Sequence, residues 1–134
     1  MVTTRQGKVD DGTSVLDFEP EELDRWDFAV QGYQRGVPMG GDLRLSDKGD
    51  TPTFLVAARK DQLSGNLDRI QVIKGWLDAG GKRHEKVYDV VWAGDRKPDA
   101  KGKLPPVGNT VDVANATWTN TIGAPELITV WKDP

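Results

Sequence analysis

Hydrophobic residues between Leu23 and Tyr33 recur every three to four positions, which places them on one face of a helix. Pro20 suits the first turn of such a helix because the N–H that it lacks would have no partner there. Gly36 is typical of a residue just past a helix end. The pattern therefore predicts one helix over about 20–35.

The remaining hydrophobic residues favour strands. Runs of β-branched, aromatic and aliphatic residues, several of them alternating with polar ones, predict five strands. These strands cover about 51–59, 67–77, 84–92, 110–119 and 127–132. Five strands and one helix indicate a mainly β fold of the β-rich α+β class, with an antiparallel, sandwich-like sheet. We expect a single β-rich domain over 20–134, preceded by a polar, acidic segment over 1–19.

The clearest hairpin joins the second and third of these strands. The turn over 78–82 contains Gly80 and Gly81, which accept positive φ angles without strain. In the strand before the turn, Ile73 and Gly75 interrupt strict alternation. This interruption predicts a β-bulge.

The connection over 93–109 is too long for a routine turn. Structureless connections longer than about 12–15 residues tend to be functional or disordered, and the prolines of this one stiffen it. We therefore take this loop and its borders as the candidate ligand or interface site. Its candidate residues are Trp92, Asp95, Arg96, Asp99 and Asn109.

A calcium site in this loop would need several oxygen ligands at alternating positions. Asp95, Asp99 and backbone carbonyls near Gly102 could supply some of them. Lys101, however, stands where a further acid is expected, and the neighbouring lysines add more positive charge. We therefore interpret the segment as a solvated, turn-rich loop and predict no metal ligand and no cofactor.

The composition excludes several kinds of chemistry. The chain has no cysteine and one histidine, so it offers no disulfide, no thiol nucleophile and no site with several histidines. His84 is expected at an exposed strand end, and none of the three serines lies in a Gly-x-Ser-x-Gly motif. The glycines of 36–42 follow the predicted helix, whereas a phosphate site needs them before one. No catalytic residue is predicted.

A net charge of −3 gives no general attraction to nucleic acid or to an anionic membrane. The acidic residues of 8–28 are interpreted as a solvated face, with a surface for a basic partner as the alternative. The sequence has no apolar run of about 20 residues and no apolar region at its N-terminus. We expect a soluble chain, whose compartment the sequence leaves open.

Five tryptophans stand beside only three phenylalanines and two tyrosines. In a chain with so few other aromatic residues, most of these rings are expected in the core. The alternative is that a ring at a strand end stays exposed and stacks on a carbohydrate or another small ligand. The tryptophans are Trp26, Trp76, Trp92, Trp118 and Trp131.

Several long runs resemble one protein family. They are NLDRIQVIKGW at 66–76, HEKVYD at 84–89, GDRKPD at 94–99, GKLPPVGNTV at 102–111 and TNTIGA at 119–124, with the stretch 32–43 before them. The chain closely resembles the C-terminal part of a large bacterial family, the domain of unknown function 3604 family. The resemblance covers about 20–134.

The resemblance implies a hydrolase family. Its members are longer, with a front part similar to metal-dependent hydrolases of the polymerase-and-histidinol-phosphatase type. The metal-binding motifs of that front part do not occur here, so no catalytic residue is carried over. We expect a fragment without activity of its own, with a structural or accessory role, whose loop over 93–109 closes over the missing active site. The alternative is a free-standing module that binds a small ligand or carbohydrate.

The resemblance also bears on partners. The family sequence continues past Trp131–Pro134 into another β-rich stretch, which implies that the sheet lacks its last strand here. Because unpaired strand edges recruit other strands, we expect a homodimer or other self-association through that edge.

Overall fold

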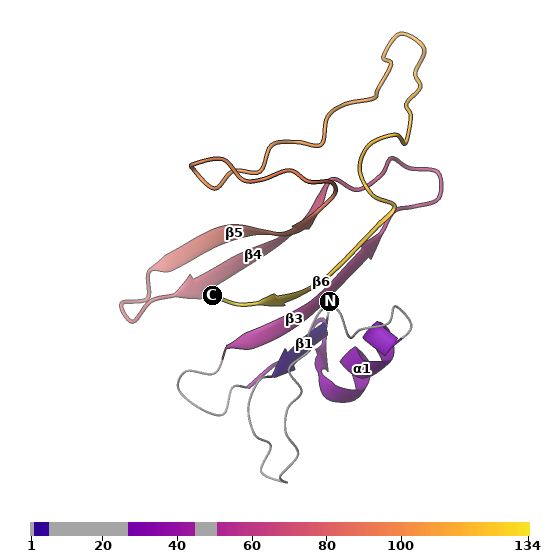
Figure 1. Ribbon diagram of the computed structural model, residues 1–134. Coiled ribbons are helices and arrows are strands. Elements are labelled where there is room, and N and C mark those ends of the chain that lie inside the picture. The colour runs from indigo at the N-terminus through magenta and orange to yellow at the C-terminus, as the bar shows by residue number, and fades with distance from the viewer. Residues whose placement is uncertain (1, 6–26, 45–50) are drawn as a thin grey trace. The chain divides into compact units, whose positions relative to one another are not determined.

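The computed structural model describes residues 2–5, 27–44 and 51–134 (Figure 1). The fold is mainly β, with antiparallel pairing and one short helix, which confirms the predicted fold class. The elements are β1 Val2–Arg5, α1 Asp27–Arg35, β2 Val37–Pro38, β3 Pro52–Arg59, β4 Arg69–Leu77, β5 Arg83–Trp92 and β6 Glu126–Lys132.

The chain divides into two compact units, each described by itself. The first unit is Met1–Ala57 with Ile128–Pro134, and the second is Ala58–Leu127. The strands form a four-stranded sheet in the order β2-β1-β3-β6 and a two-stranded sheet of β4 and β5. The sandwich-like arrangement and the single domain over 20–134 stay predictions.

In the first unit, β1 lies between β2 and β3, and Val2 pairs with both Pro38 and Leu55. α1 lies against β1 and β2 (Figure 1). The predicted helix is confirmed over 27–35, and its expected first turns lie outside the described residues. β1 falls within the N-terminal segment for which no element was predicted.

β3 supplies the core of the first unit. Leu55 and Val56 are buried in succession, as expected for a continuous apolar run on an interior strand. Phe54 packs against Trp131 of β6, with ring centroids 5.4 Å apart. The predicted strands over 51–59 and 127–132 are therefore confirmed as β3 and β6.

In the second unit, β4 and β5 form the predicted hairpin, paired along their whole length. A bulge interrupts the register: Ile70 pairs with Val91, but the next residue, Gln71, pairs with Asp89. Val90 is thus the extra residue, and it belongs to β5.

The predicted location of the bulge is therefore wrong. Ile73 and Gly75 keep regular pairs with Val87 and Glu85. Ile73 interrupts the alternation because its side chain lies exposed on the face that it shares with Val87. The residue that disturbs the pattern is an apolar side chain on a solvent face, and the backbone there is regular.

Two turns share the sequence Asp-Ala-x-Gly-Lys, one beginning at Asp78 and the other at Asp99. In each, the Asp Oδ1 accepts hydrogen bonds from the N–H groups of the third and fifth residues, at 2.8 or 2.9 Å. The fourth residues, Gly81 and Gly102, have φ angles of +78° and +75°. The first turn closes the hairpin, and the second folds the loop that follows β5.

The prediction of a strand over 110–119 is wrong. This segment is a loop, and its strand-like pairing is limited to one isolated β-bridge between Asp112 and Thr117. Asp112 accepts hydrogen bonds from the N–H groups of Ala114 and Asn115 and from the Asn115 side chain. Such local side-chain bonds compete with strand pairing, and here they form a turn instead.

In the described part of the chain, the nine-residue α1 is too short to cross a bilayer, and no longer apolar helix is present.

Candidate functional site

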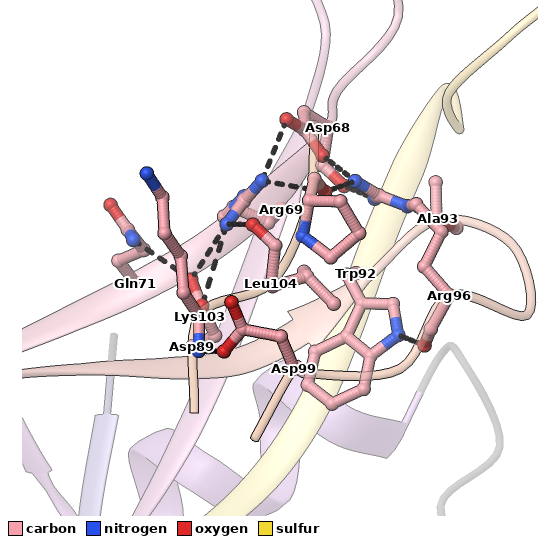
Figure 2. Close-up of polar contacts among 11 residues, drawn as sticks. Asp68, Arg69, Gln71, Asp89, Trp92, Ala93, Arg96, Asp99, Lys103 and Leu104 are labelled. Carbon is pink, nitrogen blue, oxygen red and sulfur yellow. Dashed lines mark hydrogen bonds and ion pairs between the residues drawn. The ribbon is translucent and has the colours of Figure 1, made fainter. Parts of the chain in front are cut away.

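Arg96 holds the beginning of the loop that follows β5 (Figure 2). Its guanidinium group and Nε donate hydrogen bonds to the carbonyls of Ala93, Pro105 and Asp68, at 2.6 to 3.0 Å. The backbone carbonyl of Arg96 in turn accepts a hydrogen bond from Trp92 Nε1 at 2.8 Å. The loop therefore folds back on the end of the hairpin through one side chain.

Arg69, at the start of β4, holds a later part of the same loop (Figure 2). Its guanidinium group donates to the carbonyls of Leu104 and Pro105, at 3.0 and 3.1 Å. It also contacts the carboxylates of Asp68 and Asp89, at 3.2 and 3.4 Å. Leu104, which this clamp holds, is 1% exposed and is a core residue of the second unit.

Asp68 joins the two arginines. Its Oδ1 lies 2.6 Å from Arg96 Nη1, and its Oδ2 lies 3.2 Å from Arg69 Nη2. Burial by itself raises the pKa of Asp68, but the hydrogen bonds and positive charges of Arg96 and Arg69 outweigh it, so the pKa lies below its usual value. We call Asp68, Arg69 and Arg96 the arginine clamp.

The structure brings two of the predicted site residues together and separates the others. Trp92 Nε1 donates to the backbone carbonyl of Arg96, and Arg96, a member of the arginine clamp, donates to the carbonyl of Ala93. Asp99 holds the second Asp-Ala-x-Gly-Lys turn, and Asp95 is exposed. Asn109 lines a separate groove farther along the loop. The arrangement around Trp92 and Arg96 stabilises the loop.

Beyond the clamp, the second unit contains an open groove of about 660 Å³, which we call the Trp118 groove. It is lined by residues from 63–68, 107–111 and 118–122. A volume of this size lies within the range of small-molecule sites. Trp118 is 50% exposed, so a large part of its ring surface is open to a ligand.

Asn66 joins two walls of the groove. Its N–H donates to Asn120 Oδ1 at 2.9 Å, and its side-chain Nδ2 donates to the carbonyls of Asn120 and Ile122. Beside it, Leu67 and Ala124 exchange two backbone hydrogen bonds, at 2.8 and 3.0 Å. These bonds fix the segment that carries Trp118 against the segment that precedes β4.

The close approach of these walls requires a glycine at position 123. Gly123 has a φ of +77°, and a Cβ there would lie 2.7 Å from the carbonyl oxygen of Leu67 and 2.8 Å from Asn66 Cβ. Any larger residue would therefore meet both backbone strain and a steric clash.

The third wall is fixed by a hydroxyl group. Thr110 Oγ1 donates a hydrogen bond of 2.6 Å to the carbonyl of Thr119, next to Trp118. Asn109 Oδ1 accepts the N–H of Val111, which leaves the Asn109 Nδ2 group without a hydrogen bond among the described residues. The groove is thus pre-formed by hydrogen bonds within the chain.

The lining of the groove is almost uncharged. Its charged side chain is Asp68, whose carboxylate pairs with both arginines of the clamp. The other lining residues are Leu63, Ser64, Gly65, Asn66, Val107, Gly108, Asn109, Thr110, Val111, Trp118, Thr119, Asn120 and Ile122. The arrangement suits a neutral ligand that has both apolar and hydrogen-bonding surface.

A second hollow, of about 450 Å³, lies at the turn end of the hairpin. Here His84 stacks on Trp76, with centroids 5.3 Å apart, and its Nε2 lies 2.8 Å from Asp78 Oδ2. The hydrogen bond from His84, together with those from backbone N–H groups, lowers the pKa of Asp78. His84 lies at a strand end, as expected, but its side chain is half-buried, and its bond to Asp78 stabilises the turn.

The family model described as "Protein of unknown function (DUF3604)" matches residues 14–134 of this chain. The chain belongs to the DUF3604 family. Comparisons with curated proteins and with solved structures find no match. The matched DUF3604 region contains both the arginine clamp and the Trp118 groove.

The exposure of the tryptophan side chains in this DUF3604 chain contradicts the prediction that most of them lie in the core. Trp76 and Trp118 are 42% and 50% exposed, and Trp92 and Trp131 are half-buried. The expectation that most of them form the core is therefore wrong for those that the structure describes, while Trp26 lies outside the described residues. The reason is that Trp76 and Trp118 lie on a two-stranded hairpin and on a loop, which have little structure to cover them.

The groove of the DUF3604 chain is what sequence reasoning missed. In the sequence, Asn66, Asn120 and Gly123 stand out only as parts of the runs that resemble the family, and Trp118 lies in a predicted strand that does not form. Their one common signal is that each lies in a long run matching the family or directly beside one.

Among the described residues, no group of three or more His, Asp or Glu side chains lies close enough to hold a metal ion.

Proposed function

We propose that this chain is a non-catalytic accessory module of a family of metal-dependent hydrolases. The resemblance of its runs to the C-terminal part of such proteins is one support. The other is the arginine clamp, because Arg96 of the candidate loop and Arg69 of β4 donate their hydrogen bonds to backbone carbonyls of the chain itself. In this proposal, the loop after β5 is a rigid surface that rests against the hydrolase part.

The proposal predicts that the purified chain does not hydrolyse phosphoesters. We would incubate it with a generic aryl phosphomonoester and an aryl phosphodiester, each in the presence of Mg²⁺, Mn²⁺ or Zn²⁺. The expected rate is that of the buffer with the same metal. Turnover that exceeds this rate and that persists through a second purification step would contradict the accessory role.

We further propose that copies of the chain associate through the four-stranded sheet. β6 is the last strand in the order β2-β1-β3-β6, and strands at the edge of a sheet are where other strands add. Addition of an equivalent strand across a two-fold axis would give a closed homodimer.

A second candidate function is the binding of a small ligand, and the Trp118 groove is the observation that favours it. The groove has the volume of a small-molecule site, walls held by hydrogen bonds and an exposed indole. This function is compatible with an accessory role, because an accessory module can hold a substrate for its enzyme. Its test is the binding experiment described below.

A further inference from the structure

The exposed ring of Trp118 presents a flat apolar surface with a polar edge. Half of the residue is open to solvent, and its indole N–H has no hydrogen-bond partner among the described residues. An indole of this kind offers apolar contact across its face and a donor at its rim. Ligands that match it have a flat C–H face bordered by hydrogen-bonding groups.

Further polar groups in the groove are available to a ligand. The Nδ2 group of Asn109 and the Oδ1 atom of Asn66 make no hydrogen bond within the described residues, whereas the other side-chain atoms of both amides are used in the walls. One group donates and the other accepts. Hydroxyl groups can satisfy both, because each hydroxyl is at once a donor and an acceptor.

The charge of the lining selects against ionic ligands. No lysine or arginine lines the groove, so an anion such as a phosphate would find no cation there. The carboxylate of Asp68 is paired with Arg69 and Arg96, so a cationic ligand would compete with two guanidinium groups.

From these observations we propose that the Trp118 groove binds a neutral carbohydrate. The C–H face of one sugar ring stacks on Trp118, and its hydroxyl groups bond to Asn109 Nδ2 and Asn66 Oδ1. Leu63 and Val111, both exposed at the groove, contact the remaining C–H surface. This inference rests on the small-ligand-binding function proposed above and names its ligand class.

The test measures binding of the full chain to three sets of probes by isothermal titration calorimetry. The first set is neutral disaccharides with different linkages, such as cellobiose, maltose, xylobiose and mannobiose. The second is acidic sugars, such as digalacturonate, and the third is apolar fragments without hydroxyl groups. We expect binding at micromolar to millimolar concentration by at least one neutral sugar and weaker binding by the other two sets.

Two tryptophan variants locate the site. Trp118→Ala should weaken the binding of the neutral sugar by at least about tenfold, because it removes the stacking surface. Trp76→Ala is the matched control, since Trp76 is similarly exposed but lies at the hairpin turn, and it should leave the affinity within about twofold. Circular dichroism checks that both variants are folded.

The outcomes distinguish the carbohydrate inference from the small-ligand function on which it rests. Binding of neutral sugar that survives Trp118→Ala would overturn the assigned site. If acidic sugars or apolar fragments bind in a Trp118-dependent manner and neutral sugars do not, the carbohydrate inference is wrong and the small-ligand function stands. If none of the probes binds at millimolar concentration, both are contradicted.

Discussion

Arginine side chains are suited to holding an irregular loop, because each guanidinium group has several N–H donors in a fixed plane. Backbone carbonyls in a loop have no regular ladder to bond to, and buried ones need a partner. In this protein, Arg69 and Arg96 together donate to the carbonyls of Leu104, Pro105, Ala93 and Asp68. Asp68 supplies the opposite charge between the arginines, which links loop folding to the protonation of one carboxylate.

The first prediction concerns the pH dependence of stability at Asp68. Its pKa is lowered in the folded protein, so the folded state favours the charged form, and the resulting stabilisation is present above the unfolded pKa of about 3.9. As the pH falls from about 4 through the lowered pKa, this stabilisation is lost. Asp68→Asn should therefore lower the free energy of unfolding at neutral pH and show a shallower decline below about pH 4.

Urea unfolding between neutral and strongly acidic pH, followed by circular dichroism, measures both curves. The control is Asp95→Asn, which changes an exposed carboxylate in the same loop and should leave the acid limb of the curve as it is in the wild type. A wild-type curve and an Asp68→Asn curve that stay parallel down to the acid end would contradict the role of the clamp.

Among the secondary-structure elements, the hairpin and β3 were predictable because their signals are local. The alternation of β5, the apolar run of β3 and the composition of the turn at 78–82 all lie within a few neighbouring residues. The segment 110–119 shows the opposite case. Its apolar residues alternate as in a strand, but Val111 and Val113 are exposed, and the Asp112 side chain favours a turn.

The two Asp-Ala-x-Gly-Lys turns also show that a short sequence pattern can predict a local structure. The copy at 78–82 was predicted as a turn because two adjacent glycines mark it. The copy at 99–103 has the same bonds, although Lys101 takes the place of one glycine. A comparison of the two pentapeptides would have assigned Asp99 to the turn and removed it from the candidate ligands.

The second prediction compares three glycines of the second unit. Gly123→Ala should lower the free energy of unfolding by about 3 kcal/mol or more, since a positive φ and a clash with Leu67 act together. Gly102→Ala has the positive φ without a close neighbour, and about 1 kcal/mol is expected. Gly65→Ala has neither feature, so we expect no loss or a small gain.

Thermal unfolding of the three variants measures this order. The Gly123→Ala variant should also lose the ligand that the Trp118 groove binds, because the two walls joined by Asn66 move apart. An equal effect at positions 123 and 65 would show that the wall contact does not form in solution.

At the scale of the whole molecule, the third prediction concerns self-association. We expect light scattering at micromolar concentration to give a mass above that of one 14.7 kDa chain. Ile128→Lys, which adds a charge to β6, should shift the mass towards the monomer, because charges on edge strands oppose strand addition. Val113→Lys is the control, since it adds the same charge to an exposed loop residue. A wild-type chain that is monomeric throughout would contradict the proposal.

The sequence by itself determined the β-rich class, the hairpin with its turn, and the family, because periodicity, turn composition and long matching runs are contained in short stretches. Only the tertiary structure decided the positions of the bulge, the arginine clamp and the Trp118 groove. Asn66 and Asn120 are hydrogen-bonded although they lie 54 positions apart in the sequence, and Arg69 bonds to the carbonyl of Pro105, which lies 36 positions away. Hydrogen bonds over such separations depend on how the intervening chain folds, so no local sequence pattern predicts them. The same holds for Trp118, whose sequence gives its size and chemistry, while its exposure depends on what the rest of the chain leaves uncovered.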